Sequence, residues 1–272
     1  MLNLTLDLIN KHNLNIKTDL DEQRLIDQIF LNKLISLADI KKNDIVLEIG
    51  TGIGNITNLI AEKSSFIYAI EKNPKFKDVL KDRFGQHKNI KLIIGNALNL
   101  KWPKIDKIIS NIPYSITEAL IQKLTDKKFI LAVLIVPKSF SIILTSKTGE
   151  KKFTKLSFIS SLFFEVKEYN TIPPSAYFPK PRISTTIITL RPRNYIEPWE
   201  KVLRSTILSK SKKTRNALSE ALIQSCVPIY PSTKRNASKF IESLNLIPEI
   251  TEKRVARLSL EDLRLLKTKL ST

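Results

Sequence analysis

The chain has 272 residues, 42% of them hydrophobic, so it can bury a core and is not a disordered polyelectrolyte. Its 45 Lys and Arg against 26 Asp and Glu give a formal net charge of +19. That excess favours a polyanionic partner, because cations gain affinity by displacing counterions from phosphates, although a lysine-rich proteome would also produce it. Cys226 is the single cysteine, and His12 and His87 are the only histidines, so we expect neither an intrachain disulfide nor a metal site.

No apolar stretch reaches the roughly 18–20 residues of a membrane span, and the start lacks the apolar core of a signal peptide. We therefore expect a cytoplasmic protein without membrane contact.

Strands and helices are predicted to alternate over most of the chain. Residues 1–20 indicate a short helix and a basic tether, and residues 21–40 a helix with one apolar face. The predicted strands are 44–50, 65–72, 89–98, 106–114, 129–137, 155–172 and 184–192, and the helices between them are 55–63, 74–84 and 116–124. This alternation is typical of a mostly parallel, doubly wound α/β sheet of the Rossmann-like kind.

The pattern changes near residue 193. The segments 198–210, 213–224, 233–245 and 259–270 all have helical periodicity. We therefore expect an α/β domain over 1–193, with 1–20 as an extension, and a small all-helical domain over 194–272. Residues 191–272 hold 17 Lys and Arg and 8 Asp and Glu, a net charge of +9, so the helical domain is basic as well.

A glycine-rich turn follows the first of the alternating strands. Gly50, Gly52 and Gly54 are three of the chain's six glycines, and they let the backbone turn tightly and approach a ligand. A turn without a ligand is the alternative interpretation. Glu71 disfavours it, since an acidic residue at the end of the next strand can accept hydrogen bonds from both hydroxyls of a ribose. Asn55 replaces the last glycine of the dinucleotide pattern, so we predict S-adenosylmethionine, which has a ribose but no pyrophosphate.

Two more polar side chains fall at strand ends. Glu48 can help to hold the amino-acid part of the cofactor, and Asn96, after the third strand, can bond the adenine amino group. Because parallel strands end at the same edge of a sheet, these positions indicate one crevice.

The fourth of these strands ends in Asn111, Ile112, Pro113 and Tyr114, which a capped loop could also contain. Here the chain resembles the ribosomal RNA adenine N6,N6-dimethyltransferases, which include the small-subunit dimethyladenosine transferases. The resemblance covers about 250 residues and rests on LEIGTGIGNIT (47–57), SNIPYSI (110–116), IPPSAYFPKPRISTTIITLRPR (172–193), KSKKTRNAL (210–218) and LSLEDLRLL (258–266). It implies dimethylation of adenines in a small-subunit rRNA hairpin, with a role in ribosome biogenesis.

The resemblance also implies roles for individual residues. Two acceptors, the Asn111 side-chain oxygen and the Ile112 carbonyl, would bind the amino hydrogens of the target adenine, and Pro113 would hold that carbonyl inward. Tyr114 would stack on the base, with Tyr177 on its other face. The candidate cofactor residues are Gln23, Leu25, Glu48, Gly50, Gly52, Glu71, Lys72, Asn96, Ala97 and Asn111, and the candidate RNA-binding residues are Lys210, Lys212, Lys213 and Arg215.

The chain departs from the family at three places. Glu22, Gln23, Arg24 and Leu25 stand where relatives have Gln, Asn or His, Phe and Leu, and Asn96 stands where they have Asp. In residues 136–142, Pro137, Ser139 and Ile142 replace a stretch that carries Gln, Glu and Arg in relatives. These changes bear on activity more than on fold.

Other functions remain open on the sequence. A resistance-type methyltransferase acting on large-subunit RNA would share the fold, and so would a catalytically weak RNA-binding assembly or transcription factor. Asn111, Tyr114 and Glu71 favour an enzyme, whereas Asn96 and Arg24 favour the factor. For the enzyme we expect a monomer whose partner is ribosomal RNA within a pre-assembled small subunit.

Overall fold

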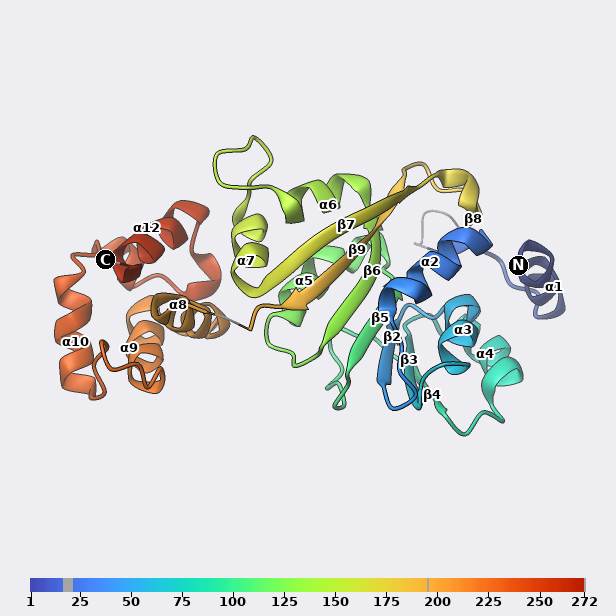
Figure 1. The fold of residues 1–272 in the computed structure, drawn as a ribbon, viewed down its shortest axis with the longest axis horizontal. Coiled ribbons are helices and arrows are strands. Elements are labelled where there is room, and N and C mark those ends of the chain that lie inside the picture. The colour runs from blue at the N-terminus through green and yellow to red at the C-terminus, as the bar shows by residue number, and fades with distance from the viewer. Residues whose placement is uncertain (17–21, 195, 272) are drawn as a thin grey trace. The chain divides into compact units, whose positions relative to one another are not determined.

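The computed structural model describes residues 1–16, 22–194 and 196–271 (Figure 1). The chain divides into two compact units, each built from two segments. The first unit comprises Met1–Ser146 and Phe164–Pro192, and the second comprises Lys147–Phe163 and Arg193–Thr272. Within the described ranges, no helix is both long and apolar enough to cross a membrane.

The described part of the first unit contains a seven-stranded sheet with the order β4-β3-β2-β5-β6-β9-β7. Its strands are β2 (Ile45–Ile49), β3 (Phe66–Glu71), β4 (Ile90–Ile94), β5 (Lys107–Asn111), β6 (Leu131–Pro137), β7 (Phe164–Ile172) and β9 (Thr185–Pro192). Strands β4, β3, β2, β5 and β6 run parallel, and β9 runs antiparallel to both β6 and β7. The predicted fold class is confirmed. The order reverses at β2 and β5, which is where such sheets open a crevice for ligands.

Helices cover the sheet. In the first unit they are α1 (Leu2–Lys11), α2 (Gln28–Ala38), α3 (Asn55–Ala61), α4 (Lys77–Phe84), α5 (Thr117–Leu124) and α6 (Lys138–Thr145). The described residues of this unit also form the short 3₁₀ turns η2 (Pro74–Phe76), η3 (Tyr114–Ile116) and η4 (Pro174–Ala176). Helices α3 and α4 lie against β3 and β4 (Figure 1).

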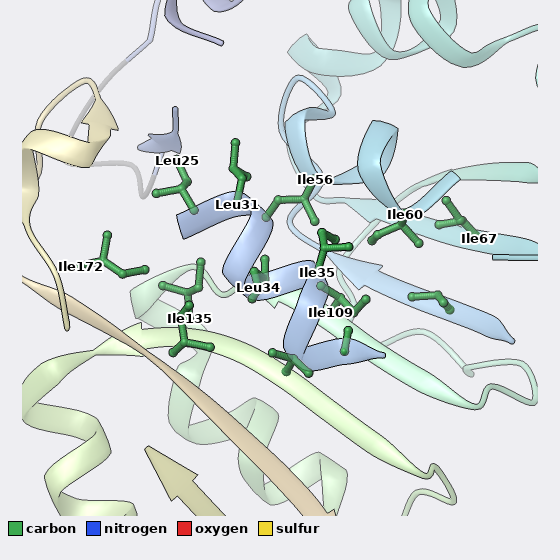
Figure 2. Packing of buried hydrophobic residues seen from close by; sticks show 14 of the residues in the cluster. Leu25, Leu31, Leu34, Ile35, Ile56, Ile60, Ile67, Ile109, Ile135 and Ile172 are labelled. Carbon is green, nitrogen blue, oxygen red and sulfur yellow. The ribbon is translucent and has the colours of Figure 1, made fainter. Parts of the chain in front are cut away.

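A hydrophobic cluster joins α2 to the centre of the sheet. Figure 2 shows Leu31, Leu34 and Ile35 of α2 beside Ile109 of β5 and Ile135 of β6. The alternate residues of these strands are buried as well, so both faces of the sheet are covered, as parallel strands require. Each aliphatic side chain buried there contributes about 1.5–3 kcal/mol.

Helix α2 begins at Gln28, seven residues later than the periodicity of 21–40 predicts. Asp27 caps it, because its Oδ1 accepts hydrogen bonds from the backbone N–H groups of Ile29 (2.8 Å) and Phe30 (3.4 Å). The backbone of a capping aspartate is extended, so the helix cannot continue to the residues before Asp27. The apolar residues there match the helical spacing only by coincidence.

The residues just before that cap form a strand instead. Strand β1 (Arg24–Leu25) pairs antiparallel with β8 (Tyr177–Phe178), so Arg24 lies opposite Phe178. A pairing between segments so far apart leaves no signal in local periodicity. The predicted basic tether overlaps 17–21, which lie outside the described residues.

The predicted strand 155–172 is wrong in its first half. Residues Lys155–Phe163 form helix α7, and β7 starts only at Phe164. Thr154 and Ser157 cap the helix reciprocally: the Ser157 N–H donates to Thr154 Oγ1 (3.4 Å), and the Thr154 N–H donates to Ser157 Oγ (2.9 Å). The apolar residues are spaced for a helix, but their density also suits a buried strand.

Helix α7 belongs to the second unit, together with α8 (Pro198–Leu208), α9 (Thr214–Gln224), α10 (Lys234–Ser243), α11 (Pro248–Thr251), η5 (Val255–Arg257) and α12 (Leu260–Ser271). The break after Pro192 is close to the predicted boundary at 193/194, and residues 147–163 group with the second unit. The division into a methyltransferase domain and an RNA-binding domain stays a prediction. The Arg204 guanidinium lies 5.4 Å from the Phe163 ring, and Arg193 donates to the Ser161 carbonyl (3.1 Å). These contacts hold α7 against the segment that includes α8.

Candidate functional site

A cavity of about 390 Å³ opens at the carboxyl ends of β2, β3, β4 and β5. The sequence-predicted residues that line it are Gln23, Leu25, Gly50, Glu71, Lys72, Asn96, Ala97, Asn111, Ile112, Pro113 and Tyr114. Four strand ends therefore supply one pocket, as their positions in the sequence indicated. Glu48, Gly52 and Tyr177 are not among its lining residues.

The glycine-rich turn contacts the tetrad Asn111–Tyr114, which lines the same pocket. Gly50, Gly52 and Gly54 have φ angles of +75°, +59° and +87°, which side chains rarely adopt. A Cβ on Gly50 would lie only 3.1 Å from Cδ of Pro113. Glycine at position 50 thus lets the turn pack directly against the tetrad Asn111–Tyr114.

Glu71 is held in place by the backbone. Its Oε2 accepts the N–H of Gly52 (2.7 Å), and its Oε1 accepts the N–H of Asn73 (2.8 Å). The residue is 7% exposed and lines the pocket. Each carboxylate oxygen has two acceptor sites, so each can accept one further hydrogen bond, and two hydroxyls of a ribose fit that geometry.

Asn96 follows β4, and its side chain is also fixed. Its Oδ1 accepts the N–H of Leu98 (3.0 Å), and the carbonyl of its neighbour Ala97 accepts the indole N–H of Trp102 (2.8 Å). One acceptor site on Oδ1 remains for an amino group in the pocket.

Asn111 lines the pocket and has a side-chain acceptor that no described residue uses. Its Nδ2 donates to the Gln23 carbonyl (3.3 Å), and because a carbonyl only accepts, this bond fixes which end of the amide is oxygen. The Oδ1 is buried and has no hydrogen-bond partner among residues 1–16, 22–194 and 196–271. A buried acceptor without a partner at a cavity wall is rare in folded proteins and suits a ligand that donates there.

The rest of the tetrad is rigid. Ile112 donates its N–H to the Ile135 carbonyl (3.2 Å). The Pro113 carbonyl accepts the N–H of Ile116 (3.1 Å) and the hydroxyl of Thr117 (3.3 Å), which ties the loop to the start of α5. Tyr114 lines the pocket at the first position of η3.

Two predicted site residues are directed elsewhere. Glu48 is 1% exposed, and its Oε2 accepts the hydroxyl of Thr57 (2.6 Å). Burial raises the pKa of Glu48 to about 8, against the lowering effect of the Thr57 hydrogen bond. Tyr177 is 3% exposed, with its hydroxyl 2.6 Å from Oγ1 of Thr185, so its ring packs in the core. Burial raises the pKa of this phenol as well.

The structure adds Arg24 to the pocket. Its guanidinium carbon lies 4.6 Å from the ring centroid of Phe76, which also lines the cavity. Burial lowers the pKa of Arg24, and the charges of Glu71 and Glu22 oppose that shift. The sequence marked Arg24 only as a departure from the family. The β1–β8 pairing that places it in the pocket could not be foreseen.

The candidate RNA-binding residues lie on the second unit and are engaged at its surface. Lys212 pairs with Glu220, Lys213 with Glu252 (2.6 Å) and Arg215 with Glu242 (2.9 Å). Lys210 is exposed. Backbone bonds hold this segment beside a second basic segment, since the N–H of Ala256 donates to the Lys210 carbonyl and that of Thr214 to the Lys253 carbonyl.

The departure at 136–142 has a structural counterpart. Lys138 pairs with Glu168 of β7, and the hydroxyl of Ser141 donates to the same carboxylate (3.0 Å). Helix α6, which the sequence did not predict, is thereby joined to the edge of the sheet.

The strand order, and a pocket at the carboxyl edge with a ribose-type carboxylate and a buried amide acceptor, define a nucleoside-binding α/β protein. A family model described as ribosomal RNA adenine dimethylase matches residues 13–253, and the chain belongs to that family. The resemblance drawn from the sequence motifs is confirmed.

Curated relatives extend along most of the chain. A "Probable ribosomal RNA small subunit methyltransferase A" of Methanothermobacter thermautotrophicus is 32% identical over 262 residues, which cover 95% of this chain and 92% of the relative. A protein of the same name from Methanosphaera stadtmanae is 35% identical over 223 residues, covering 81% and 82%.

Two solved structures are similar over nearly their whole lengths. A dimethyladenosine transferase from Plasmodium falciparum has a TM-score of 0.60 and 27% identity, covering 89% of this chain and 95% of that one. The 23S rRNA methyltransferase ErmE has a TM-score of 0.61 at 18% identity, covering 91% and 99%, and at that identity it shows a shared fold alone.

Proposed function

We propose that this chain transfers methyl groups from S-adenosylmethionine to N6 of adenines in a small-subunit rRNA hairpin, as a step in ribosome biogenesis. The buried Oδ1 of Asn111 carries the proposal, because no described residue hydrogen-bonds to it and Asn111 lines the same cavity as Glu71. The names of the curated relatives support the small subunit over the large one.

The pocket residues fit the cofactor. Glu71 can accept both ribose hydroxyls while it keeps its bonds to Gly52 and Asn73. Asn96 can accept a hydrogen bond from the adenine amino group, with Ala97 beside it. When bound, S-adenosylmethionine supplies an electrophilic methyl group, and every other requirement falls on the protein.

The tetrad would orient the target base. Adenine N6 is a poor nucleophile because its lone pair is delocalised into the ring. Hydrogen bonds from its two amino hydrogens to Asn111 Oδ1 and to the Ile112 carbonyl would direct that lone pair towards the methyl group. Both acceptors are held by the bonds to Gln23 and Ile135, so alignment alone can lower the barrier without a general base.

Tyr114 would hold the flipped base. A target adenine must leave its stack, at a cost of a few kcal/mol. An aromatic platform returns about 1–3 kcal/mol per base. The Pro113 carbonyl, bonded to Ile116 and Thr117, fixes the turn from which Tyr114 projects.

Binding of the RNA itself would involve the second unit. Lys212, Lys213 and Arg215 each pair with a glutamate there, and the side chains of these pairs are 43–64% exposed. Exposed pairs contribute only about 0–1 kcal/mol each, so phosphates can displace the glutamates at little cost.

Methyl transfer to purified ribosomal subunits tests the proposal. Small and large subunits from a methylase-deficient strain would each be incubated with the protein and tritiated S-adenosylmethionine, with the slower Asn111→Ala variant as the control. We expect label in N6,N6-dimethyladenosine of small-subunit rRNA. Label in the large subunit would favour the resistance-type enzyme. Tight RNA binding without label in either would favour a non-catalytic assembly factor.

A further inference from the structure

Arg24 occupies the part of the pocket assigned to the cofactor. Its side chain lies over Gly52, where an added Cβ would meet Arg24 Nε at 2.5 Å, and its guanidinium stacks on Phe76. It lines the cavity with Glu71. Arg24 Nε is buried and has no hydrogen-bond partner in the part of the chain that the structure describes.

The acidic groups around Arg24 are engaged with other donors. Glu71 accepts two backbone N–H groups, and Glu22 accepts the amide of Asn73 (3.0 Å) and the ammonium of Lys75 (2.5 Å). Both carboxylates favour the charged guanidinium through space, yet within the described residues neither forms an ion pair with it. Arg24 is half-buried, and a partly buried cation with no ion-pair partner among the described residues is costly, so a ligand anion would offset that cost.

We propose, building on the function proposed above, that Arg24 binds the carboxylate of the methionine part of S-adenosylmethionine. The cofactor's sulfonium and amine are cationic, and its ribose and adenine are neutral, so the carboxylate is its only anion. A guanidinium matches a carboxylate through two parallel hydrogen bonds.

An RNA phosphate is the other anion that the pocket could meet. Arg24 contacts Phe76 and Gly52, beside the ribose-type carboxylate Glu71, rather than the Tyr114 end where the target base is expected. The observations therefore favour the cofactor.

Two ligands that differ by one carboxylate test this assignment. Calorimetry would compare S-adenosylhomocysteine with its decarboxylated analogue, which keeps the amine and the nucleoside. Arg24→Gln should weaken binding of S-adenosylhomocysteine by about 10- to 100-fold, the usual effect of losing a hydrogen bond to a charged group. It should change binding of the decarboxylated analogue by less than about threefold. Arg24→Lys, which keeps the charge without the fork, should fall between wild type and Gln.

Lys75→Gln is the matched control. Lys75 is a second cation over the Phe76 ring (5.1 Å) and the partner of Glu22, but it does not line the pocket. The Lys75→Gln variant should lose the same affinity for both ligands, or lose none for either. A carboxylate-selective loss in Lys75→Gln as large as that in Arg24→Gln would reduce the effect to general electrostatics and overturn the assignment.

Other outcomes also decide. If Arg24→Gln lost the same affinity for both ligands, Arg24 would be a packing residue. If it bound both ligands more tightly, Arg24 would obstruct the pocket. Either result overturns the proposal. Circular dichroism and thermal unfolding would establish that each variant folds, and Arg24→Met, which keeps the stem on Phe76, replaces Gln if that variant is unstable. A folded wild type that binds neither ligand would contradict the proposed function itself, a result distinct from binding without carboxylate selectivity.

Discussion

The polar groups of the pocket and the cations of the second unit are held in opposite ways. Glu71 is 7% exposed and Asn111 Oδ1 fully enclosed, and the backbone fixes both side chains. Lys213 and Arg215 have side chains 58% and 44% exposed, paired with glutamates on the surface. Replacing any one of these pocket groups should therefore cause a large loss of binding or activity. Replacing single cations of the second unit should cause small, additive losses of RNA affinity that depend on salt.

The largest effect expected among the buried polar groups concerns Glu48, which does not itself line the pocket. Its pKa is about 8 in the folded protein against an ordinary value of 4.5, so the folded protein holds a proton that the unfolded chain releases between these pH values. Its contribution to the free energy of unfolding is full below pH 4.5, falls as the pH rises towards 8, and is lost above it, a change on the order of a few kcal/mol.

Urea unfolding at pH 5, 7 and 9 checks this. Glu48→Gln should lose less stability than wild type over that range, while Glu62→Gln, at an exposed site, should follow wild type. Parallel curves for wild type and Glu48→Gln would mean that Glu48 ionises as a surface carboxyl does.

Next in size is the amide of the tetrad. Asn111→Ala removes an acceptor that orients the amino group, so the single-turnover methyl-transfer rate should fall about 100-fold, the effect of deleting one preorganised hydrogen-bonding group. Cofactor affinity, measured by calorimetry, should fall much less. A parallel fall in both would place Asn111 in the cofactor site alone.

Glu71→Ala should weaken cofactor binding by roughly 1.5–3 kcal/mol, the usual effect of losing hydrogen bonds to a charged group. The dissociation constant for S-adenosylhomocysteine provides the measurement, and the exposed Glu62→Ala provides the control. An unchanged constant in Glu71→Ala would remove this residue from the site.

Stacking should have a smaller effect than the hydrogen bonds. Tyr114→Phe keeps the aromatic face and should stay within about tenfold of wild type, roughly 1.4 kcal/mol. Tyr114→Ala loses that face and should cost roughly 1–3 kcal/mol. Single-turnover rates on one RNA would compare them, and equal impairment of both variants would assign the effect to the hydroxyl.

The smallest effects are expected on the second unit. Lys213→Gln should weaken RNA binding a few-fold at low salt and reduce the salt slope of log K by about one. Glu252→Gln frees the same lysine from its pair and should strengthen binding or leave it unchanged. Filter binding across salt concentrations measures both. Equal weakening by the two variants would show that the pair is structural.

The sequence predicted those parts of the site that depend on local pattern. Gly50, Glu71, Asn96 and Asn111 each follow a buried strand, and parallel strands bring their carboxyl ends together whatever the details of packing. The sheet could be predicted for the same reason, because short stretches of sequence are enough to show that strands and helices alternate.

What the sequence could not predict depends on distant contacts. Arg24 enters the pocket through the pairing of β1 with β8, and Tyr177 leaves it for Thr185. Glu48 turns towards Thr57 because a buried carboxyl takes the nearest donor that packing supplies. Helix α7 was missed because its apolar residues satisfy the patterns of both helix and strand.

The interleaved course of the chain bears on how the protein is made. The chain leaves the first unit after Ser146, forms α7 in the second, returns at Phe164 for β7 and β9, and leaves again after Pro192. During synthesis α7 therefore emerges before two strands of the sheet and well before α8, the helix it contacts. A polypeptide ended at residue 193 would carry α7 without α8, and its apolar side chains would invite aggregation. A separable α/β fragment must thus omit 147–163 as well, with a linker joining Ser146 to Phe164.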